Sequence, residues 1–217
     1  MTLVQMLATR SIAPFRTEVT SKLETFGSVQ ETLEKWLKVM AQWMSLVLVF
    51  TGGEIAKQMP QESKIFKSTD AQWKKIMERV AEQKLVIPCC QNDLLTSALP
   101  KMQEDLEYCQ RKLETYLEKK RGVFPRFYFA SNSDLLKILS IGTDPSKIQD
   151  DFEKMFDAIS RVTFDKIDKR LIVAINQDWG GTTETVELDE HIKCEGNIED
   201  WLCRLEGSMQ NSMRNIC

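Results

Sequence analysis

The clearest hydrophobic pattern lies between Val29 and Phe50, where large apolar residues recur every three or four positions. This repeat predicts one helix with a single buried face. The face would comprise Leu33, Trp36, Leu37, Met40, Trp43, Met44, Val47 and Phe50. Ser28 and Glu31 have capping-box spacing at its start, and Gly52-Gly53 supplies a stop at its end. A packed helix core explains the two tryptophans better than a ligand groove does.

Further helices follow from the same periodicity. They are predicted over residues 14–26, over 54–59 before Pro60, from a capping-box pair at Thr69 and Gln72 to about residue 80, over 100–122, over 131–142 and over 144–159. Pro100 is placed at the first position of its helix, where a missing N–H is tolerated. Residues 85–90 are predicted to be a loop or a brief extended piece.

The C-terminal part changes character, because Val, Ile and Thr become frequent between turn signals. Strands are predicted at 161–166, 170–177 and 182–188. A helix from Asn197 follows, with an apolar face of Ile198, Trp201, Leu202, Leu205, Met209 and Met213. It reaches Cys217 without a stop signal, so we expect a longer parent chain.

The predicted fold class is mainly α: an elongated helical-bundle rod with a small antiparallel β-meander near the C-terminus. The chain is predicted to divide into three segments: helical subdomains at 1–160, the meander at 161–192 and the C-terminal helix at 193–217.

The segment from Phe124 to Phe129 is the most specific local feature. Pro125 would break a helix and pushes Phe124 toward extended geometry. Three Phe and one Tyr in six residues predict a mostly buried segment where helices cross. If Arg126 follows them inside, it needs a carboxylate or carbonyl partner.

Charge and composition exclude several classes of function. The 217 residues carry 29 Lys and Arg against 32 Asp and Glu, a net charge of -3 without the positive excess that nucleic-acid binding requires. The longest apolar run, from Met44 to Phe50, is too short to span a membrane. With no secretory signal, a reducing intracellular compartment is the default. The six cysteines are scattered, which predicts free thiols.

The sequence predicts no catalytic, cofactor-binding or metal-ligating residues. It has neither GxxxxGK[ST] nor GxGxxG, so a phosphate loop is not expected. The one histidine, His191, is predicted in an exposed loop beyond a strand, without a catalytic role. Cys89-Cys90 suits small buried filler better than a redox pair. Lys119-Lys120-Arg121 is interpreted as cations that stabilise a helix C-terminus.

The stretch from Tyr116 to Arg121, the segment Phe124–Phe129, Ser131 and Leu135-Leu136 together resemble the linker of dynein heavy chains. Further residues that match this family lie on both sides of these residues and in the same order along the chain: Trp36, Trp43, Phe50, Gly53-Glu54-Ile55, Gln58-Met59-Pro60, Phe66, Trp73, Met77, Asn197 and Trp201-Leu202. Residues 117–121 and 87–90 look more like axonemal heavy chains than the cytoplasmic form. Residues 44–47 and Ala130 depart from the axonemal pattern, which puts contacts there in doubt.

The resemblance implies the C-terminal part of a linker, a non-catalytic lever that transmits nucleotide-driven changes of an AAA+ ring to the tail. ATP and Mg would bind in that ring, outside this sequence. Implied partners are the ring of the same heavy chain, other dynein subunits through the tail, and microtubules only indirectly, in the cytoskeleton of a cilium or flagellum. The implied core or junction residues are Phe124, Pro125, Arg126, Phe127, Tyr128, Phe129, Ser131, Leu135, Leu136, Trp36, Trp43 and Trp201.

Bending of such a lever is expected where helices are interrupted, at Gly52-Gly53, residues 85–93 or residues 122–125. The competing function is a helical scaffold or tether that binds protein partners without a stroke. An enzyme is the least favoured interpretation.

Overall fold

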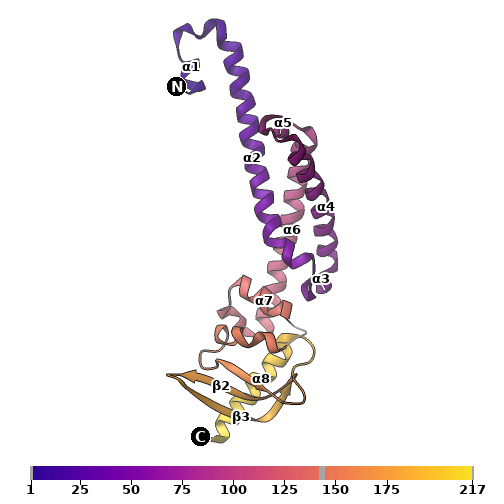
Figure 1. Ribbon diagram of the computed structural model, residues 1–217, viewed down its shortest axis with the longest axis vertical. Helices are drawn as coiled ribbons and strands as arrows, with labels where there is room; N and C mark the ends of the chain where they lie inside the picture. The colour runs from indigo at the N-terminus through magenta and orange to yellow at the C-terminus, as the bar shows by residue number, and fades with distance from the viewer. Residues whose placement is uncertain (1, 142–144, 217) are drawn as a thin grey trace. The chain divides into compact units, whose positions relative to one another are not determined.

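The computed structural model describes residues 2–141 and 145–216 and divides into two compact units (Figure 1). Unit 1 comprises Met1–Thr51 and Pro60–Gln110, and unit 2 comprises Gly52–Met59 and Arg111–Cys217. The chain therefore passes between the units three times, and residues 52–59 belong to unit 2 although both their neighbours in sequence belong to unit 1.

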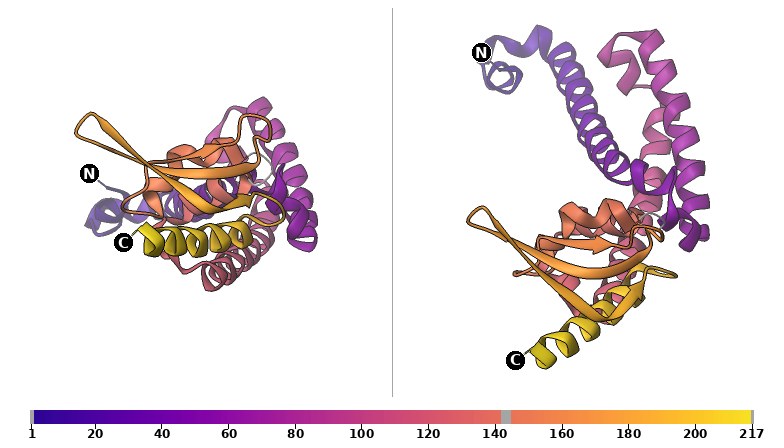
Figure 2. Two further views of the ribbon diagram at one scale, coloured as in Figure 1. Left: turned by 90° about the horizontal axis from the view of Figure 1, so that it is seen from below. Right: turned by 60° about the horizontal axis from the view of Figure 1, so that its bottom comes forward.

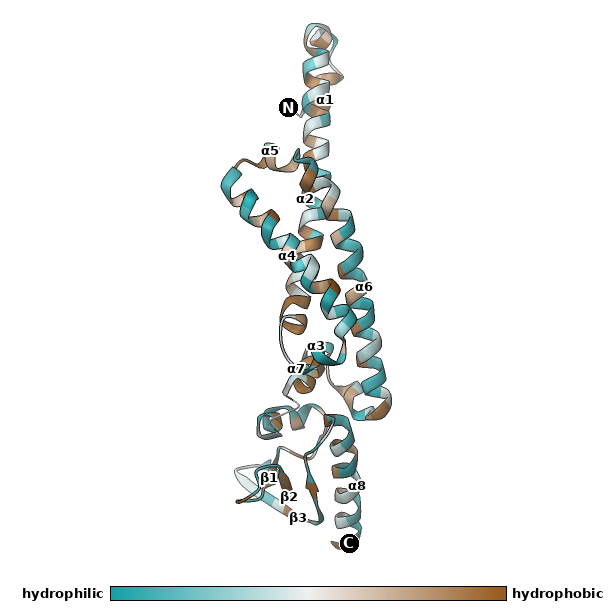
Figure 3. Ribbon diagram, turned by 90° about the vertical axis from the view of Figure 1, so that its right-hand side faces the viewer, coloured by the Kyte–Doolittle hydropathy of each residue, from teal (hydrophilic) through white to brown (hydrophobic). Residues whose placement is uncertain are grey.

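Unit 1 consists of helices in its described part. They are α1 (Leu3–Leu7), the 3-10 helix η1 (Arg10–Phe15), α2 (Arg16–Phe50), α4 (Pro60–Gln83), α5 (Val86–Cys90) and the first part of α6 (Asp93–Val123). Polar residues run along the outer faces of α4 and α6 (Figure 3). Aromatic pairs join α2 to α4: the ring centroids of Phe50 and Phe66 lie 5.5 Å apart, and those of Trp43 and Trp73 lie 6.1 Å apart.

Unit 2 combines helices with the sheet. It holds α3 (Glu54–Gln58), the end of α6, η2 (Pro125–Phe129), α7 (Asn132–Ile141), η3 (Pro145–Lys154), β1 (Arg161–Phe164), β2 (Leu171–Trp179), β3 (Thr182–Lys193) and α8 (Ile198–Ile216). The strands are antiparallel in the order β1-β2-β3, and α8 packs along β3 (Figure 2). The predicted helical fold with a small meander is confirmed. The predicted Gly142 stop and Asp144 start lie outside the described residues.

The C-terminal elements differ in detail from the prediction. The strand β3 continues to Lys193, so His191 lies within it, exposed, and not in a loop. On α8 the buried face turns away from Met213 and includes Ser212, whose Oγ accepts a hydrogen bond from the Asp189 N–H at 2.8 Å. A serine that bonds the neighbouring strand can be buried at little cost, which apolar periodicity cannot anticipate.

Helix α2 contradicts two predictions. It runs unbroken through Gly27 and Ser28, and Ser28 is an interior residue whose carbonyl accepts a hydrogen bond from the Thr32 hydroxyl at 2.9 Å. Packing elsewhere along α2 offsets the cost of one interior glycine, about 1 kcal/mol. Its buried face is also rotated from the predicted one, since Leu37 and Met44 are exposed.

Three further local predictions were wrong. Thr69 lies inside α4, with its hydroxyl donating to the Ile65 carbonyl at 3.2 Å, instead of capping a helix. Residues 86–90 form the helix α5 and not a loop. Helix α6 begins at Asp93, so Pro100 lies in its interior. Buried Leu95 and Leu99 hold this first part of α6 against the core, which offsets the hydrogen bond that proline cannot donate. Of the described cysteines, all five are free thiols, as predicted.

Candidate functional site

The aromatic segment after α6 forms the centre of unit 2. Phe124 is extended (φ −122°, ψ 94°), as the following proline predicts, and η2 starts at Pro125. Phe124 and Phe127 are both 0% exposed and meet edge to face, with ring centroids 5.0 Å apart. The ring centroid of Phe156 lies 6.1 Å from that of Phe124. Two residues of the segment therefore anchor the core.

The other half of the segment points outward. Tyr128 is 61% exposed and Phe129 75% exposed, so the expectation that both are buried was wrong. A 3-10 helix has three residues per turn, which puts residues 124 and 127 on one side and turns the next two away from it. The composition of the segment could not reveal this, because only the backbone conformation decides which rings face inward.

Arg126 is half-buried, with its side chain 36% exposed, and has both a carboxylate and a carbonyl partner. Its Nε donates to Glu206 Oε1 on α8 at 2.9 Å, and its Nη1 donates to the Met155 carbonyl at 3.4 Å. The guanidinium carbon lies 4.8 Å from the centroid of the Phe156 ring. Arg126 thereby links η2 to α8 and to the end of η3.

Arg121 connects α6 to the start of α7. Its Nη2 donates to Asn132 Oδ1 at 2.7 Å, and its Nη1 pairs with Glu118 at 2.8 Å. Ser131 caps α7, because its Oγ accepts from the Asp134 N–H at 3.2 Å. The residues between α6 and α7 are thus held by side chains at both ends.

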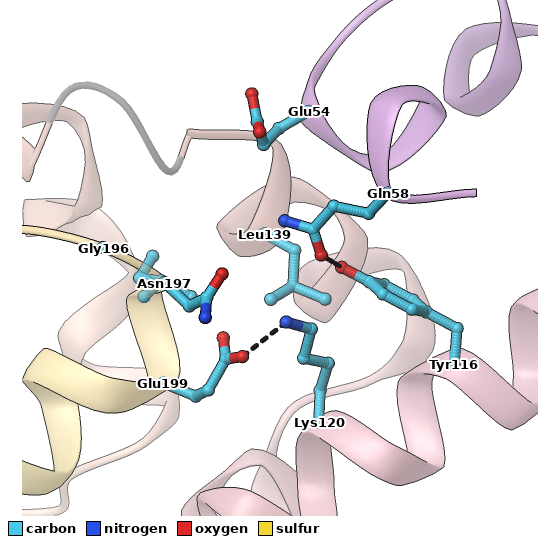
Figure 4. A pocket seen from close by; sticks show the side chains of 9 residues that line it. Glu54, Gln58, Tyr116, Lys120, Leu139, Gly196, Asn197 and Glu199 are labelled. Carbon is cyan, nitrogen blue, oxygen red and sulfur yellow. Dashed lines mark hydrogen bonds and ion pairs between the residues drawn. The ribbon is translucent and has the colours of Figure 1, made fainter. Parts of the chain in front are cut away.

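A buried ion pair joins α6 to α8, between Lys120 and Glu199 (Figure 4). Their side chains are only 12% and 6% exposed. Glu199 Oε1 takes part in the pair, while Oε2 has no hydrogen-bond partner in the structure. Lys120 lies in the last turn of α6, as interpreted from the sequence, and it also pairs with a buried carboxylate that the sequence did not identify. One signal was available, since Lys120 continues the apolar spacing of Leu113 and Leu117.

A small polar pocket of about 100 Å³ lies beside this pair. The Tyr116 hydroxyl donates to Gln58 Oε1 at 2.7 Å and so ties α6 to α3 (Figure 4). Burial, and then the negative charges of Glu199 and Glu54, raise the pKa of Tyr116 to about 12. Tyr116 therefore stays protonated at neutral pH and is no general base.

A second ion cluster fixes α7 to η3. Asp151 is 0% exposed and lies 3.0 Å from Lys137 Nζ and 2.9 Å from Lys154 Nζ. Lys154 also reaches Asp134, and its hydrogen bond, followed by that of Ser131, lowers the pKa of the Asp134 carboxyl. Charged residues in unit 2 thus connect elements to one another.

The remaining predicted site residues divide between the units. In unit 2, Leu135 and Trp201 are buried and Leu136 is half-buried. In unit 1, Trp36 and Trp43 are half-buried, and Trp43 Nε1 donates to Asp70 Oδ1 at 2.9 Å. Across the described residues we find no cluster of His, Cys, Asp or Glu that could hold a metal ion. No helix within 2–141 or 145–216 has the length and apolar character for crossing a membrane.

Comparisons with known proteins identify relatives. Residues 1–217 match the family described as "Dynein heavy chain, N-terminal region 2". The chain is 38% identical to the dynein gamma chain of the flagellar outer arm of Chlamydomonas reinhardtii, over all of this chain and 5% of that relative. It is 39% identical to human dynein axonemal heavy chain 8 and 40% identical to rat dynein axonemal heavy chain 5, over all of this chain and 5% and 6% of those relatives. The chain thus spans about a twentieth of their length.

Proposed function

This chain belongs to the dynein heavy chain family, and from that premise we propose that it is the C-terminal part of a linker that transmits movement from an AAA+ ring to the tail. The ring of the same heavy chain would bind ATP and Mg and carry out hydrolysis. Other dynein subunits would attach through the tail, and microtubules would be reached only indirectly. Its relatives are axonemal and flagellar heavy chains, which assigns the chain to the cytoskeleton of a cilium or flagellum.

The packing of unit 2 is the observation that best supports a lever. A lever must carry force without deforming, and close-packed interiors resist deformation. In unit 2, buried aromatic rings and the Lys120–Glu199 and Arg126–Glu206 pairs join α6, η2 and α8.

This packing also bears on where the lever bends. Residues 122–125 were one expected place, yet Phe124 is fully buried and Arg121 bonds across the segment to Asn132. We therefore assign these residues to the rigid block and not to a hinge. Two other candidates for the hinge remain. One is Gly53, which lies between α2 and α3 and has a φ of 102°, and the other is residues 85–93 around α5.

The test compares two phenylalanines of the same segment in the intact heavy chain. Phe127→Ala opens a cavity in the block, whereas Phe129→Ala removes an exposed ring. We expect Phe127→Ala to lower microtubule-gliding velocity several-fold while basal ATP hydrolysis stays near wild type, and Phe129→Ala to leave both unchanged. Equal gliding velocities in all three proteins would favour a passive tether.

A further inference from the structure

Helix α2 carries two separate apolar stripes. The inner stripe follows a three-four spacing and packs within unit 1; it comprises Val29, Thr32, Trp36, Val39, Trp43, Leu46 and Phe50. The outer stripe has nearly the same spacing and comprises Leu33, Leu37, Met40, Met44 and Leu48. Two such stripes on one helix indicate two packing partners.

The outer stripe is largely uncovered. Leu37 is 58% exposed, Met44 60% and Leu48 85%, and Met40 is 36% exposed. At 100° per residue, the centre of the outer stripe lies about 110° around the helix from the centre of the inner one. The elements that pack on the inner stripe therefore leave the outer one exposed.

We propose that a further amphipathic helix covers this outer stripe and that the same heavy chain supplies it from outside residues 1–217. The stripe rises about 22 Å along α2, a length that a helix of about 15 residues matches. Its repeat is that of knobs-into-holes packing, in which large aliphatic side chains fill gaps on a facing helix. An extended strand would not match this repeat.

The chemistry of the stripe favours a permanent partner over a transient one. Its outer side is bordered by Gln30, Glu34, Lys38, Ala41 and Ser45, so that border carries one acidic and one basic side chain and no net charge to steer a separate protein. A contiguous patch of exposed Leu and Met promotes aggregation when it is left open. The relatives are about twenty times longer than this chain, so ample heavy chain is available to cover it.

The experiment measures methionine oxidation by hydrogen peroxide in two proteins, the isolated 217-residue chain and the intact heavy chain. Exposure governs the oxidation rate, so Met44 should react rapidly in the dilute isolated chain and about tenfold more slowly in the heavy chain. Met102, which is 1% exposed, should be slow in both and serves as the internal reference. Equal Met44 reactivity in the two proteins would overturn the proposal.

A second measurement identifies the occupant. Met44→Glu should leave the melting temperature of the isolated chain unchanged but lower that of the intact heavy chain, whereas the neighbouring Ser45→Glu should change neither. If Met44 became protected in the isolated chain as its concentration rose, a second copy would be the occupant and the proposal would be wrong. An unaffected heavy chain carrying Met44→Glu would also contradict it.

Discussion

The two units place their apolar and charged residues in different ways. In unit 2, Phe124, Phe127 and Phe152 are 0% exposed, and ion pairs connect the helices around them. Among its exposed large apolar residues, Ile167 and Trp179 stand singly, and Tyr128 and Phe129 are adjacent in η2. In unit 1 the longest helix leaves a whole stripe of Leu and Met uncovered. Unit 2 buries its apolar core with its own elements, whereas unit 1 has more apolar surface than its own helices can bury.

The largest expected effect tests the core of unit 2. Phe127→Ala should lower the free energy of unfolding by about 3–5 kcal/mol, because it empties a fully buried aromatic site. Phe129→Ala should change it by less than about 0.5 kcal/mol, because that ring faces solvent. Urea unfolding of the 217-residue chain measures both, and matching midpoints for the two variants would refute the assignment of inner and outer rings.

Breaking the buried ion pair should lower the free energy of unfolding by nearly as much. Lys120→Met leaves Glu199 buried without its counter-charge, which should destabilise the chain by about 3 kcal/mol. Adding Glu199→Gln removes the stranded charge and should restore most of the loss. The comparison uses a thermal-melting series of the wild type, both single variants and the double variant. If Lys120→Met left the melting temperature unchanged, that result would mean that water solvates the pair.

A matched pair on α2 tests unit 1. Leu46→Ala should cost about 2–3 kcal/mol, because Leu46 is 3% exposed on the inner stripe. Leu48→Ala, two positions away and 85% exposed, should cost less than about 0.5 kcal/mol in the isolated chain. Chemical unfolding gives both values. A costly Leu48→Ala in the isolated chain would show that its outer stripe is already covered.

The smallest expected effect is on the stability of the chain at acidic pH. Hydrogen bonds from the backbone N–H groups of Asp168 and Ile167 lower the pKa of Asp165 below its ordinary value of 3.8. Its carboxylate therefore stabilises the fold above that value and loses this contribution as pH falls through the lowered pKa. Melting temperatures between about pH 5 and pH 2 should fall less steeply for Asp165→Asn than for the wild type. Identical slopes would contradict this role.

Local sequence patterns predicted much of the fold. Apolar periodicity predicted the helical character, the frequency of Val, Ile and Thr between turn signals predicted the meander, and Pro125 predicted the break that leaves Phe124 extended. The patterns also predicted that Arg126 needs a partner, but not that Glu206, eighty residues away, provides it. Such pairings depend on the tertiary fold, as the 79-residue separation of Lys120 and Glu199 also shows.

The wrong predictions have a common physical cause, since packing outweighed local preference. Gly27 and Ser28 resemble a helix boundary, yet α2 continues through them. Both stripes of α2 were assigned to one buried face, because periodicity identifies apolar positions without showing how many partners cover them. The predicted buried face and the structure differ most at the outer stripe, which was expected to be buried and is exposed.

We expect unit 2, including residues 122–125, to move as one block. The Sγ of native Cys203 on α8 lies 3.5 Å from the Val123 carbonyl oxygen at the end of α6, so Val123→Cys places a second thiol close by. Partial burial, then the nearby Glu206, Asp200 and Glu199, raise the pKa of Cys203, so oxidation is best carried out at alkaline pH.

Gliding velocity of the intact heavy chain is measured with this disulfide formed and again after reduction, with Val123→Ser as the control for oxidation elsewhere. We expect the same velocity in both states, because the disulfide joins parts that do not move relative to each other. A velocity that falls on oxidation and recovers on reduction, in Val123→Cys alone, would contradict it and locate bending within unit 2.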